Sequence, residues 1–564
     1  MFRHQVLVVG GGLAGMRAAI EASATAEVAL LAKVYLIRSH SGAARGGINA
    51  ALGNHPEGRE DSPQRHACDT VKSSDYLTDQ PAALILAREA PERILESEHW
   101  GAAFSRFSDG RIAQRRFGGS GFPRTCHAAE HTGHALLHTL YQQTIKRKIK
   151  IYPEWQMLAL AVEDGRCHGV IALDRMSGEM AAFAAEATIL ATGGAGRLYA
   201  HTTNGIINTG SGMAVAYWAG AALKDMEFMQ FHPTTLFGTN ILANEGGSGE
   251  GGYLLNVLGE RYMQNYAPEL MELAPRDVVT RATQTEIDAG RGFEGGYVLL
   301  DLRYLGEKQI RERLPGIGEL CRHFLGINPT KEPVPIQPGQ NYTMGGIACN
   351  EHGETGIAGL YAAGECACVS VHGANRLGGN SQLETLVFGK RAGESAAKRV
   401  QEEAVSPVES ALAATLAQQR ERVEALLKRA PGHETGAIRA ELRALMTAKV
   451  GIFKHRAGLT EALEKIKELQ ERFARAGISH TGRTFNLDLA RALELEGKLA
   501  LAEVIAAGAR ARDESRGGHC RVDNPQRDDH NWLKHTVAHC GADGPALSYG
   551  EVAITDFPVE ERGP

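Results

Sequence analysis

The chemistry that this sequence could perform begins with one histidine and the glycine-rich loop 25 residues before it. The loop, residues 10–15, has the spacing G-x-G-x-x-G that holds the pyrophosphate of a dinucleotide. His40 follows in the segment Arg-Ser-His-Ser-Gly, just past the position expected for the second strand of such a unit. There a side chain would lie beside the isoalloxazine ring of a bound FAD. An imidazole could attack the flavin 8α carbon, and the bond would make the flavin a stronger oxidant. A surface histidine without a role is the alternative.

The residues around the loop predict the unit that must position it. Residues 5–9 are apolar and predict a strand, residues 13–24 are rich in alanine and predict a helix, and residues 28–31 predict a second strand. The order strand, glycine turn, helix, strand is that of a dinucleotide-binding βαβ unit. The phosphates would lie at the helix N-terminus, where free N–H groups favour anions.

Three glycines of the loop have separate expected tasks. Gly10 allows the tight turn, Gly12 lets the pyrophosphate approach the backbone, and Gly15 lets the helix pack on the strand. The second strand ends at Ala32 and Lys33, without the acidic residue that holds the ribose in typical NAD sites. The loop therefore predicts FAD rather than NAD.

Composition excludes several classes of protein. The 564 residues are 43% hydrophobic and 23% charged, as in ordinary globular proteins, and the net charge of −5 gives no electrostatic reason to bind nucleic acid. No run of about 20 apolar residues predicts a membrane span. The first expected strand begins within a few residues of the N-terminus, so we expect no signal peptide. The nine cysteines lack C-x₂-C pairs, so neither a disulfide framework nor an iron–sulfur or zinc site is expected.

Two further glycine turns follow short apolar segments and are expected near the cofactor. Residues 187–191 lead into Thr192, Gly193 and Gly194, and residues 359–364 lead into Glu365. The backbone of the first turn should pass close to FAD. The Glu365 carboxylate is placed to accept hydrogen bonds from the ribityl hydroxyls.

These patterns predict an α/β fold: an FAD-binding Rossmann-like domain, an inserted α+β capping domain and a C-terminal helical domain. Apolar residues at three- and four-residue spacing predict amphipathic helices over 408–429 and 459–476. The expected bounds are 1–235 and 342–395 for the two parts of the FAD-binding domain, 236–341 for the capping or substrate domain, 396–510 for the helical domain and 511–564 for a C-terminal region.

Many ordered motifs resemble one family over nearly the whole chain: the flavoprotein subunit of the succinate dehydrogenase and fumarate reductase complexes, respiratory complex II. The matching motifs are Arg-Ser-His at 38–40, Phe-His-Pro-Thr at 231–234, Pro-Arg-Asp at 275–277, Tyr-Thr-Met-Gly-Gly at 342–346, His-Gly-Ala-Asn-Arg-Leu-Gly-Gly-Asn-Ser at 372–381 and Arg-Asp-Asp-His-Asn-Trp-Leu at 527–533. L-aspartate oxidase shares the fold but holds FAD without the covalent histidine. His40 therefore favours the respiratory branch.

The resemblance implies a role for each matched polar residue. Arg276 would exchange a proton with the substrate carbon, and Glu245 would be the carboxylate that relays that proton. Arg376 would bind one substrate carboxylate bidentately, and His232 would hold the other. A plain carboxylate-binding arginine is the alternative for Arg276, and a core histidine is the alternative for His232. Hydride would pass between flavin N5 and one of the two central carbons of succinate.

The resemblance and the glycine turns together give a set of expected FAD-binding residues, with His40 as the covalent attachment: Gly10, Gly12, Leu13, Ala14, Gly15, Lys33, Ser39, His40, Ser41, Gly46, Gly47, Thr192, Gly193, Gly194, Ser211, Glu365, Ser381 and Gln382.

Four positions depart from the family pattern. Asn341 replaces a histidine that helps to hold a substrate carboxylate, and Asn244 replaces a threonine before the relay glutamate. Ser248 stands where an arginine normally extends the relay, and Ser211 replaces an aspartate of the FAD motif. Both asparagines can still donate hydrogen bonds to a carboxylate, so we expect them to bind substrate. A substituted succinate therefore stays open as the substrate beside succinate and fumarate.

Two other function classes are open. One is a flavin-dependent oxidase of an amino dicarboxylate such as L-aspartate, which an absence of covalent flavin would favour. The other is a structural or electron-relay flavoprotein whose substrate site has decayed. Four charged or polar residues of the motifs are retained, and their joint retention argues against decay, because a pocket without a function would not be expected to keep all of them: His232, Glu245, Arg276 and Arg376.

The resemblance also implies partners. Without a set of cluster ligands in this chain, a separate iron–sulfur subunit must take the electrons, and it would dock on a membrane anchor and so reach a quinone. The substrate would be a dicarboxylate. The chain would be peripheral, on the cytoplasmic side of the cell membrane.

Overall fold

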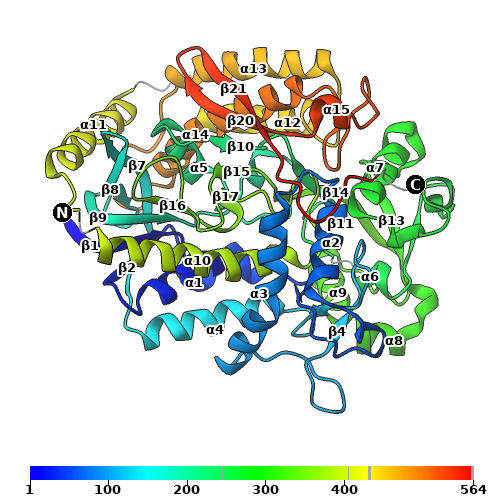
Figure 1. Ribbon diagram of the computed structural model, residues 1–564. Coiled ribbons are helices and arrows are strands. Elements are labelled where there is room, and N and C mark those ends of the chain that lie inside the picture. Colours follow the sequence, from blue (N-terminus) through cyan, green and yellow to red (C-terminus); the bar gives the residue numbers. More distant parts are fainter. Residues whose placement is uncertain (244–245, 404, 430–433, 561–564) are drawn as a thin grey trace.

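The βαβ unit opens the chain in the computed structural model, which describes residues 1–243, 246–403, 405–429 and 434–560 (Figure 1). Strand β1 (Phe2–Val9) is followed by helix α1 (Leu13–Ala22) and strand β2 (Val28–Ala32). The helix is two residues shorter than predicted. At its C-terminal end, the hydroxyl of Ser23 donates to the carbonyl of Ile20 at 2.8 Å.

Two glycines of the loop are required by close backbone approach. Gly10 has φ +123°, and a Cβ there would lie 2.0 Å from the carbonyl oxygen of Ala191. A Cβ on Gly15 would lie 1.9 Å from the carbonyl oxygen of Gly10. The loop, the first turn of α1 and the end of the strand before Thr192 therefore meet without room for a side chain.

The central sheet has seven strands and forms the FAD-binding domain. Its order is β6-β2-β1-β9-β8-β7, with β16 also paired to β9. β6, β2, β1, β9 and β16 are parallel, so their carboxyl ends share one edge, while β8 and β7 extend the sheet antiparallel. The bounds are Lys150–Pro153 (β6), Trp155–Glu163 (β7), Arg166–Asp174 (β8), Met180–Leu190 (β9) and Leu360–Ala362 (β16).

Helices cover both faces of this sheet. On one face α1 packs against α10 (Asn380–Glu402), where Gly389 and Gly393 let the two backbones approach (Figure 1). Inward-facing Leu7 and Leu31 share the other core with α5 (Ser211–Trp218) and α14 (Leu487–Ala511). Further elements of this part are α2 (Pro63–Ser73), α3 (Gln80–His99), α4 (Thr132–Lys146) and the short strands β3 (Ile48–Asn49), β4 (Gln114–Arg115) and β5 (Thr125–Cys126).

A second α+β unit is inserted into the chain and lies at the right of Figure 1. Its antiparallel sheet has the order β11-β14-β13-β12, and its apolar side chains form a core of their own. The strands are β11 (Met229–Leu236), β12 (Tyr253–Leu255), β13 (Val298–Asp301) and β14 (Val334–Thr343), and the helices are α6 (Gly246–Gly249), α7 (Arg276–Glu286), α8 (Gly306–Arg313) and α9 (Pro315–Leu320). β11 and β14 pair from Met229–Thr343 onward, so they join the unit to the FAD-binding domain.

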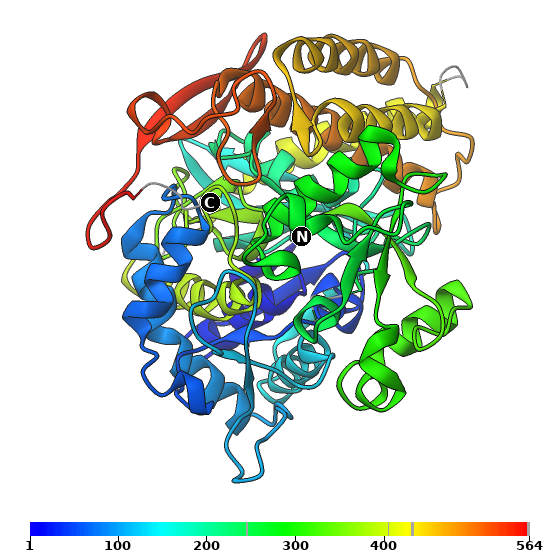
Figure 2. The same ribbon diagram turned by 90° about the vertical axis from the view of Figure 1, so that its right-hand side faces the viewer.

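Helices gather at the top of the molecule in Figures 1 and 2. They are α11 (Glu409–Lys428), α12 (Thr435–Lys449), α13 (Arg456–Ala474) and α14, with α15 (Asp529–Trp532) after them. Beside them a five-stranded sheet has the order β17-β15-β10-β20-β21. Its strands are β10 (Leu223–Lys224), β15 (Gly346–Ala348), β17 (Ala367–Cys368), β20 (Lys534–Gly541) and β21 (Gly544–Glu551); β18 (Phe453–Lys454) and β19 (Cys520–Arg521) form a separate pair. The expected α/β fold, with capping and helical domains, is confirmed.

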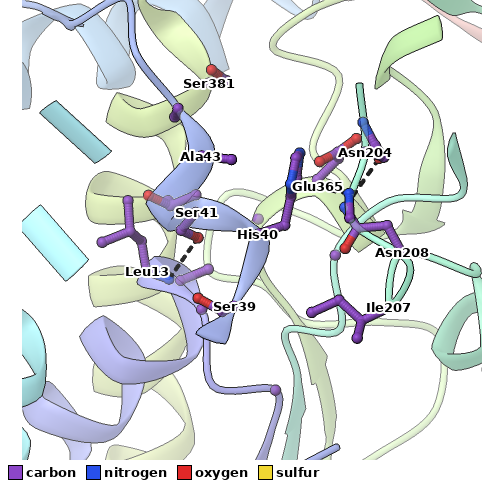
Figure 3. A pocket seen from close by; sticks show the side chains of 18 of the residues that line it. Leu13, Ser39, His40, Ser41, Ala43, Asn204, Ile207, Asn208, Glu365 and Ser381 are labelled. Carbon is purple, nitrogen blue, oxygen red and sulfur yellow. Dashed lines mark hydrogen bonds between the residues drawn. The ribbon is translucent and has the colours of Figure 1, made fainter. Parts of the chain in front are cut away.

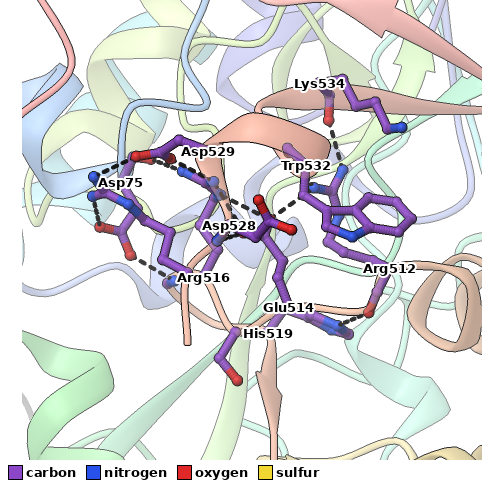
Figure 4. Close-up of polar contacts among 12 residues, drawn as sticks. Asp75, Arg512, Glu514, Arg516, His519, Asp528, Asp529, Trp532 and Lys534 are labelled. Atoms are coloured by element: carbon purple, nitrogen blue, oxygen red, sulfur yellow. Dashed lines mark hydrogen bonds and ion pairs between the residues drawn. The ribbon is translucent and has the colours of Figure 1, made fainter. Parts of the chain in front are cut away.

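A buried ion network ties the segment after α14 to the FAD-binding domain (Figure 4). Arg512 donates to Glu227 at 2.8 Å and to Glu514 at 3.0 Å, and Arg516 donates to Glu514 at 2.8 Å. All four side chains are fully buried, so removing one partner would leave an uncompensated charge. Just beyond them, the backbone N–H of Gly518 donates to the carbonyl of Ala374 at 2.8 Å, which braces the loop that carries Arg376.

In the described part of the chain no helix is long and apolar enough to cross a membrane.

Candidate active site

A cavity of about 520 Å³ opens at the carboxyl ends of β1, β2 and β9. The glycine loop and the first turn of α1 form one wall, and the segment 202–208 forms another (Figure 3). Parallel sheets bind ligands at this edge, and the volume falls in the range typical of cofactor pockets.

His40 projects into this cavity from a short helical turn, His40–Ala43 (Figure 3). The next residue, Ser41, accepts a hydrogen bond at its Oγ from the N–H of Leu13 at 3.2 Å, which joins the turn to the start of α1. The backbone N–H of Gly205 donates to Nδ1 of His40 at 3.2 Å. Enclosure of the imidazole, and then the charge of Arg197, lower the pKa of His40 to about 4. The ring is therefore neutral at physiological pH.

Most of the expected cofactor residues line the cavity: Gly10, Gly12, Leu13, Ala14, Lys33, Ser39, His40, Ser41, Gly46, Gly47, Thr192, Gly193, Ser211, Glu365, Ser381 and Gln382. Gly15 and Gly194 lie behind its wall. A Cβ on Gly194 would lie 2.1 Å from Oε1 of Glu365, so this glycine makes room for the carboxylate.

Several polar groups of the wall are suited to a polar ligand. Ser39 Oγ, Thr192 Oγ1 and Gln382 Oε1 are buried and find no hydrogen-bond partner among the described residues. Because buried polar atoms are rarely left unpaired, a dinucleotide with hydroxyl, phosphate and ring oxygens fits this wall. Lys33 is fixed by Glu494 at 2.6 Å and by the carbonyl of Ile207 at 2.8 Å.

Glu365 lies in a buried turn after β16. Burial raises the pKa of its carboxyl to about 7, although the N–H of Thr343 donates to Oε1 at 3.0 Å and opposes the rise. A carboxyl with this pKa can accept or donate a hydrogen bond near neutral pH, as a neighbouring ribityl hydroxyl would require.

Three polar residues from separate parts of the chain line the same cavity. His232 stands on β11, Arg276 is the first residue of α7, and Arg376 follows from the loop before α10. His232 and Arg376 are almost fully buried. The Arg376 guanidinium lies over the ring of Tyr342, 4.5 Å from its centroid.

Asn341, on β14, lines the cavity as well. The hydroxyl of Thr203 donates to its Oδ1 at 3.0 Å, which leaves the amide N–H groups as its donors towards a ligand. Asn244, Glu245 and the side chain of Ser248 lie outside the part of the chain that the structure describes.

Sequence reasoning missed several residues of this site. Arg197, Thr203 and Tyr342 line the cavity, and Gln230 receives hydrogen bonds from both Arg276 and Arg376. Tyr342 stood within a matched motif, but no pattern pointed to its position under Arg376. Gln230 lies two residues before His232, and that proximity was the only available signal.

Comparison with known proteins agrees with this geometry. The FAD binding domain family matches residues 5–382, and the family described as fumarate reductase flavoprotein C-term matches residues 439–564. The chain is 45% identical to a fumarate reductase flavoprotein subunit of Mycobacterium tuberculosis, over 99% of each chain. It is 44% identical to a succinate dehydrogenase flavoprotein subunit of Coxiella burnetii, over 95% of this chain and 94% of that one.

A solved structure of an E. coli quinol fumarate reductase variant superposes with a TM-score of 0.96 at 42% identity, covering 100% of this chain and 98% of that one. The chain belongs to the succinate dehydrogenase and fumarate reductase flavoprotein family. It is thus an FAD-dependent oxidoreductase, and the resemblance drawn from its motifs is confirmed.

The FAD binding domain match, residues 5–382, covers the glycine loop, the His40 turn, Glu365 and Arg276 alike. Arg276 belongs to α7 of the inserted unit, so the cavity is lined by this unit as well as by the FAD-binding domain.

Proposed function

We propose that this chain is the catalytic flavoprotein subunit of a succinate:quinone oxidoreductase or quinol:fumarate reductase, which interconverts succinate and fumarate. The proposal rests on one observation: Arg276, Arg376 and His232 line the same cavity as the glycine loop of the FAD-binding domain. A dicarboxylate brings two negative charges, and two guanidinium groups can neutralise them with directed hydrogen bonds.

Each residue then has one task. Arg376, held over Tyr342, binds one carboxylate, while His232 and Asn341 donate to the other. Arg276 exchanges a proton with one central carbon, and Glu245 returns or removes that proton, while Asn244 donates a hydrogen bond to the substrate. Bound FAD supplies the hydride acceptor for the neighbouring carbon. The protein contributes by holding the dicarboxylate in one orientation and by placing positive charge where the carboxylates lie.

His40 is proposed as the covalent attachment to the FAD 8α carbon, through Nε2. Nδ1 accepts from the N–H of Gly205 and is therefore the unprotonated nitrogen of the neutral ring, so Nε2 is the ring atom available for the bond and would give up its proton as the bond forms. The lowered pKa keeps the ring neutral, as a nucleophile must be.

We also propose that the chain passes electrons to an iron–sulfur subunit. That subunit would dock on a membrane anchor that binds a quinone, with this chain peripheral on the cytoplasmic side. A solved quinol–fumarate reductase structure with menaquinol molecules, 42% identical and with a TM-score of 0.95, supports the link to a quinone. The cysteines of this sequence lack the spacing of cluster ligands, which favours a separate electron-accepting subunit.

Steady-state turnover of the purified holoprotein tests the catalytic proposal. The wild type should oxidise succinate with an artificial acceptor and reduce fumarate with a reduced viologen. Arg276→Gln should lower kcat in both directions by about 10²–10⁴-fold with unchanged FAD content, because it removes the proton-exchanging group. Arg322→Gln, on the surface of the inserted unit, is the matched control. Absence of wild-type turnover in both directions, or an active Arg276→Gln, would refute the proposal.

A substituted succinate or L-aspartate is the second candidate substrate. Asn341 favours this candidate, because it places a neutral amide where family members have an imidazole. The hydroxyl of Thr203 fixes the orientation of that amide. A site with less positive charge accepts a substrate with a compensating polar or cationic substituent more readily.

A further inference from the structure

Gln230 is a buried amide on β11 whose carbonyl oxygen contacts both arginines of the site. Oε1 accepts a hydrogen bond from Nη1 of Arg276 at 3.2 Å and another from Nη2 of Arg376 at 2.8 Å. Nε2 donates to Oδ1 of Asn375 at 2.9 Å and to the backbone carbonyl of Arg376 at 2.8 Å. An amide has two acceptor lone pairs and two donors, so its whole hydrogen-bonding capacity is used.

This arrangement joins three separate segments of the chain. Gln230 belongs to the strand that leads into the inserted unit, Arg276 to the first turn of α7, and Arg376 to the loop before α10. α7 is fixed on β11 as well, because the hydroxyl of Thr280 donates to the carbonyl of Phe231 at 3.1 Å. One side chain therefore contacts two guanidinium groups that come from distant segments of the chain.

The chemical type of this residue matters as much as its position. Two guanidinium ions near one another repel, and a carbonyl dipole between them lowers that repulsion without adding a charge. A carboxylate in the same place would hold both arginines but would cancel the positive charge that a dicarboxylate needs. A neutral amide oxygen contacts both arginines without adding a negative charge that would oppose an anionic substrate.

We propose that Gln230 is a positioning residue that fixes the spacing between Arg276 and Arg376, and with it the alignment of bound dicarboxylate with the proton-exchanging arginine. The inference rests on the proposed function, since it assigns to the two arginines the roles given above. It adds a residue outside the matched Phe-His-Pro-Thr motif to the determinants of binding and turnover.

The test compares Gln230→Met, Gln230→Glu and wild type as FAD-loaded holoproteins. Methionine keeps the length of the side chain and removes all four hydrogen bonds, whereas glutamate keeps the acceptor and adds a charge. Malonate is the binding probe, because a dicarboxylate with a single methylene cannot form a double bond between two central carbons. Its Kd is measured from the change in flavin absorbance, beside kcat and KM for succinate.

Gln143→Met is the matched control. Gln143 is a buried glutamine on α4 that accepts from Arg147 at 2.6 Å and does not line the cavity. The Gln143→Met variant loses a hydrogen bond from an arginine to a buried amide, as Gln230→Met does, but at a position outside the site.

We expect Gln230→Met to raise the malonate Kd about tenfold and to lower kcat at least tenfold, since hydrogen bonds to charged groups contribute this much. Gln230→Glu should raise the malonate Kd further than methionine does, because the added anion competes with the ligand. FAD content should match that of Gln143→Met. This order of Kd values depends on charge and would not follow from a merely structural role.

Unchanged malonate Kd and kcat in Gln230→Met, within twofold of Gln143→Met, would overturn the proposal. If Gln230→Met does not fold, Gln230→Glu alone decides, since a malonate Kd equal to that of the wild type would equally refute it. Failure of the proposed function is distinct: wild-type holoprotein would then neither bind malonate nor turn over succinate.

Discussion

At the scale of single residues, His40 combines the position and the protonation state that covalent attachment needs. Its ring faces the FAD cavity, Nδ1 is held by Gly205, and its pKa of about 4 keeps it neutral. A protonated imidazole has no free electron pair and could not attack the flavin. The environment therefore favours the reactive form of this side chain.

Replacement of His40 by alanine should abolish covalent flavin. On a denaturing gel, flavin fluorescence should migrate with the wild-type band and be absent from the His40→Ala band, because only the bond survives unfolding. His134→Ala, an exposed histidine of α4, should keep the fluorescence. Release of flavin from the wild type would contradict covalent attachment and would favour the aspartate-oxidase-like alternative.

Asn341 is the residue that most directly separates this site from the family pattern. Asn341→His should lower KM for succinate severalfold at pH 6, because an imidazolium adds a positive charge beside the substrate carboxylate. At pH 8 the effect should vanish, since an ordinary histidine, with a pKa near 6.5, is then neutral. Asn341→Gln adds no charge and should show no such pH dependence. Steady-state kinetics at both pH values give KM for succinate. A KM of Asn341→His that does not fall at pH 6 would exclude a substrate carboxylate beside this position.

The sequence predicted residues of the site where a short motif carries the chemistry. The glycine loop follows from spacing alone, and His40, His232, Arg276 and Arg376 follow from matched motifs. Gln230 and Thr203 could not be predicted. Their roles depend on contacts between segments that the fold brings together, and neither residue type has a chemistry that marks it in a sequence.

At the scale of elements, the βαβ unit was predictable because the loop glycines and the alanine-rich helix permit only one kind of packing. Gly10 and Gly15 have backbone oxygens within about 2 Å of where a Cβ would stand. Short strands such as β10 and β17 contain two residues each and leave no periodic signal. Their pairing depends on distant partners, which is why the sequence did not reveal the five-stranded sheet.

The strand β20 is held to the FAD-binding domain by a buried histidine. His535 contacts Asp225 through Nδ1 at 2.6 Å and Asp79 through Nε2 at 3.2 Å. Burial opposes protonation of the ring, but the two carboxylates outweigh it and raise the pKa of His535 to about 9. The folded pKa exceeds the ordinary value of 6.5, so this stabilisation is complete below pH 6.5 and is lost as pH rises through 9.

His535→Gln should therefore destabilise the protein most at low pH. The difference in unfolding free energy from the wild type should be on the order of 3 kcal/mol near pH 6 and should shrink towards pH 9.5. Thermal unfolding across this range measures the trend. His99→Gln, an exposed histidine at the end of α3, should show no trend. A difference between wild type and His535→Gln that stays constant with pH would contradict the assigned protonation.

At the scale of the whole molecule, the site lies where the inserted unit meets the FAD-binding domain. β11 and β14 connect the two, α7 delivers Arg276, and the loop before α10 delivers Arg376. The buried ion network of Arg512 and Arg516 holds the segment after α14 (Figure 4), and that segment contacts the loop where the N–H of Gly518 donates to the carbonyl of Ala374. The proposed dicarboxylate chemistry would thus require the inserted unit, the FAD-binding domain and the C-terminal segment to assemble correctly.

Anaerobic mixing of the FAD-loaded wild-type chain with substrate tests the proposed chemistry most directly, because it needs no partner subunit. Flavin absorbance near 450 nm is followed after addition of succinate, then fumarate, and separately after L-aspartate. We predict that succinate bleaches the flavin, that excess fumarate restores the absorbance, and that L-aspartate has no effect. Bleaching by L-aspartate but not by succinate would contradict the assignment.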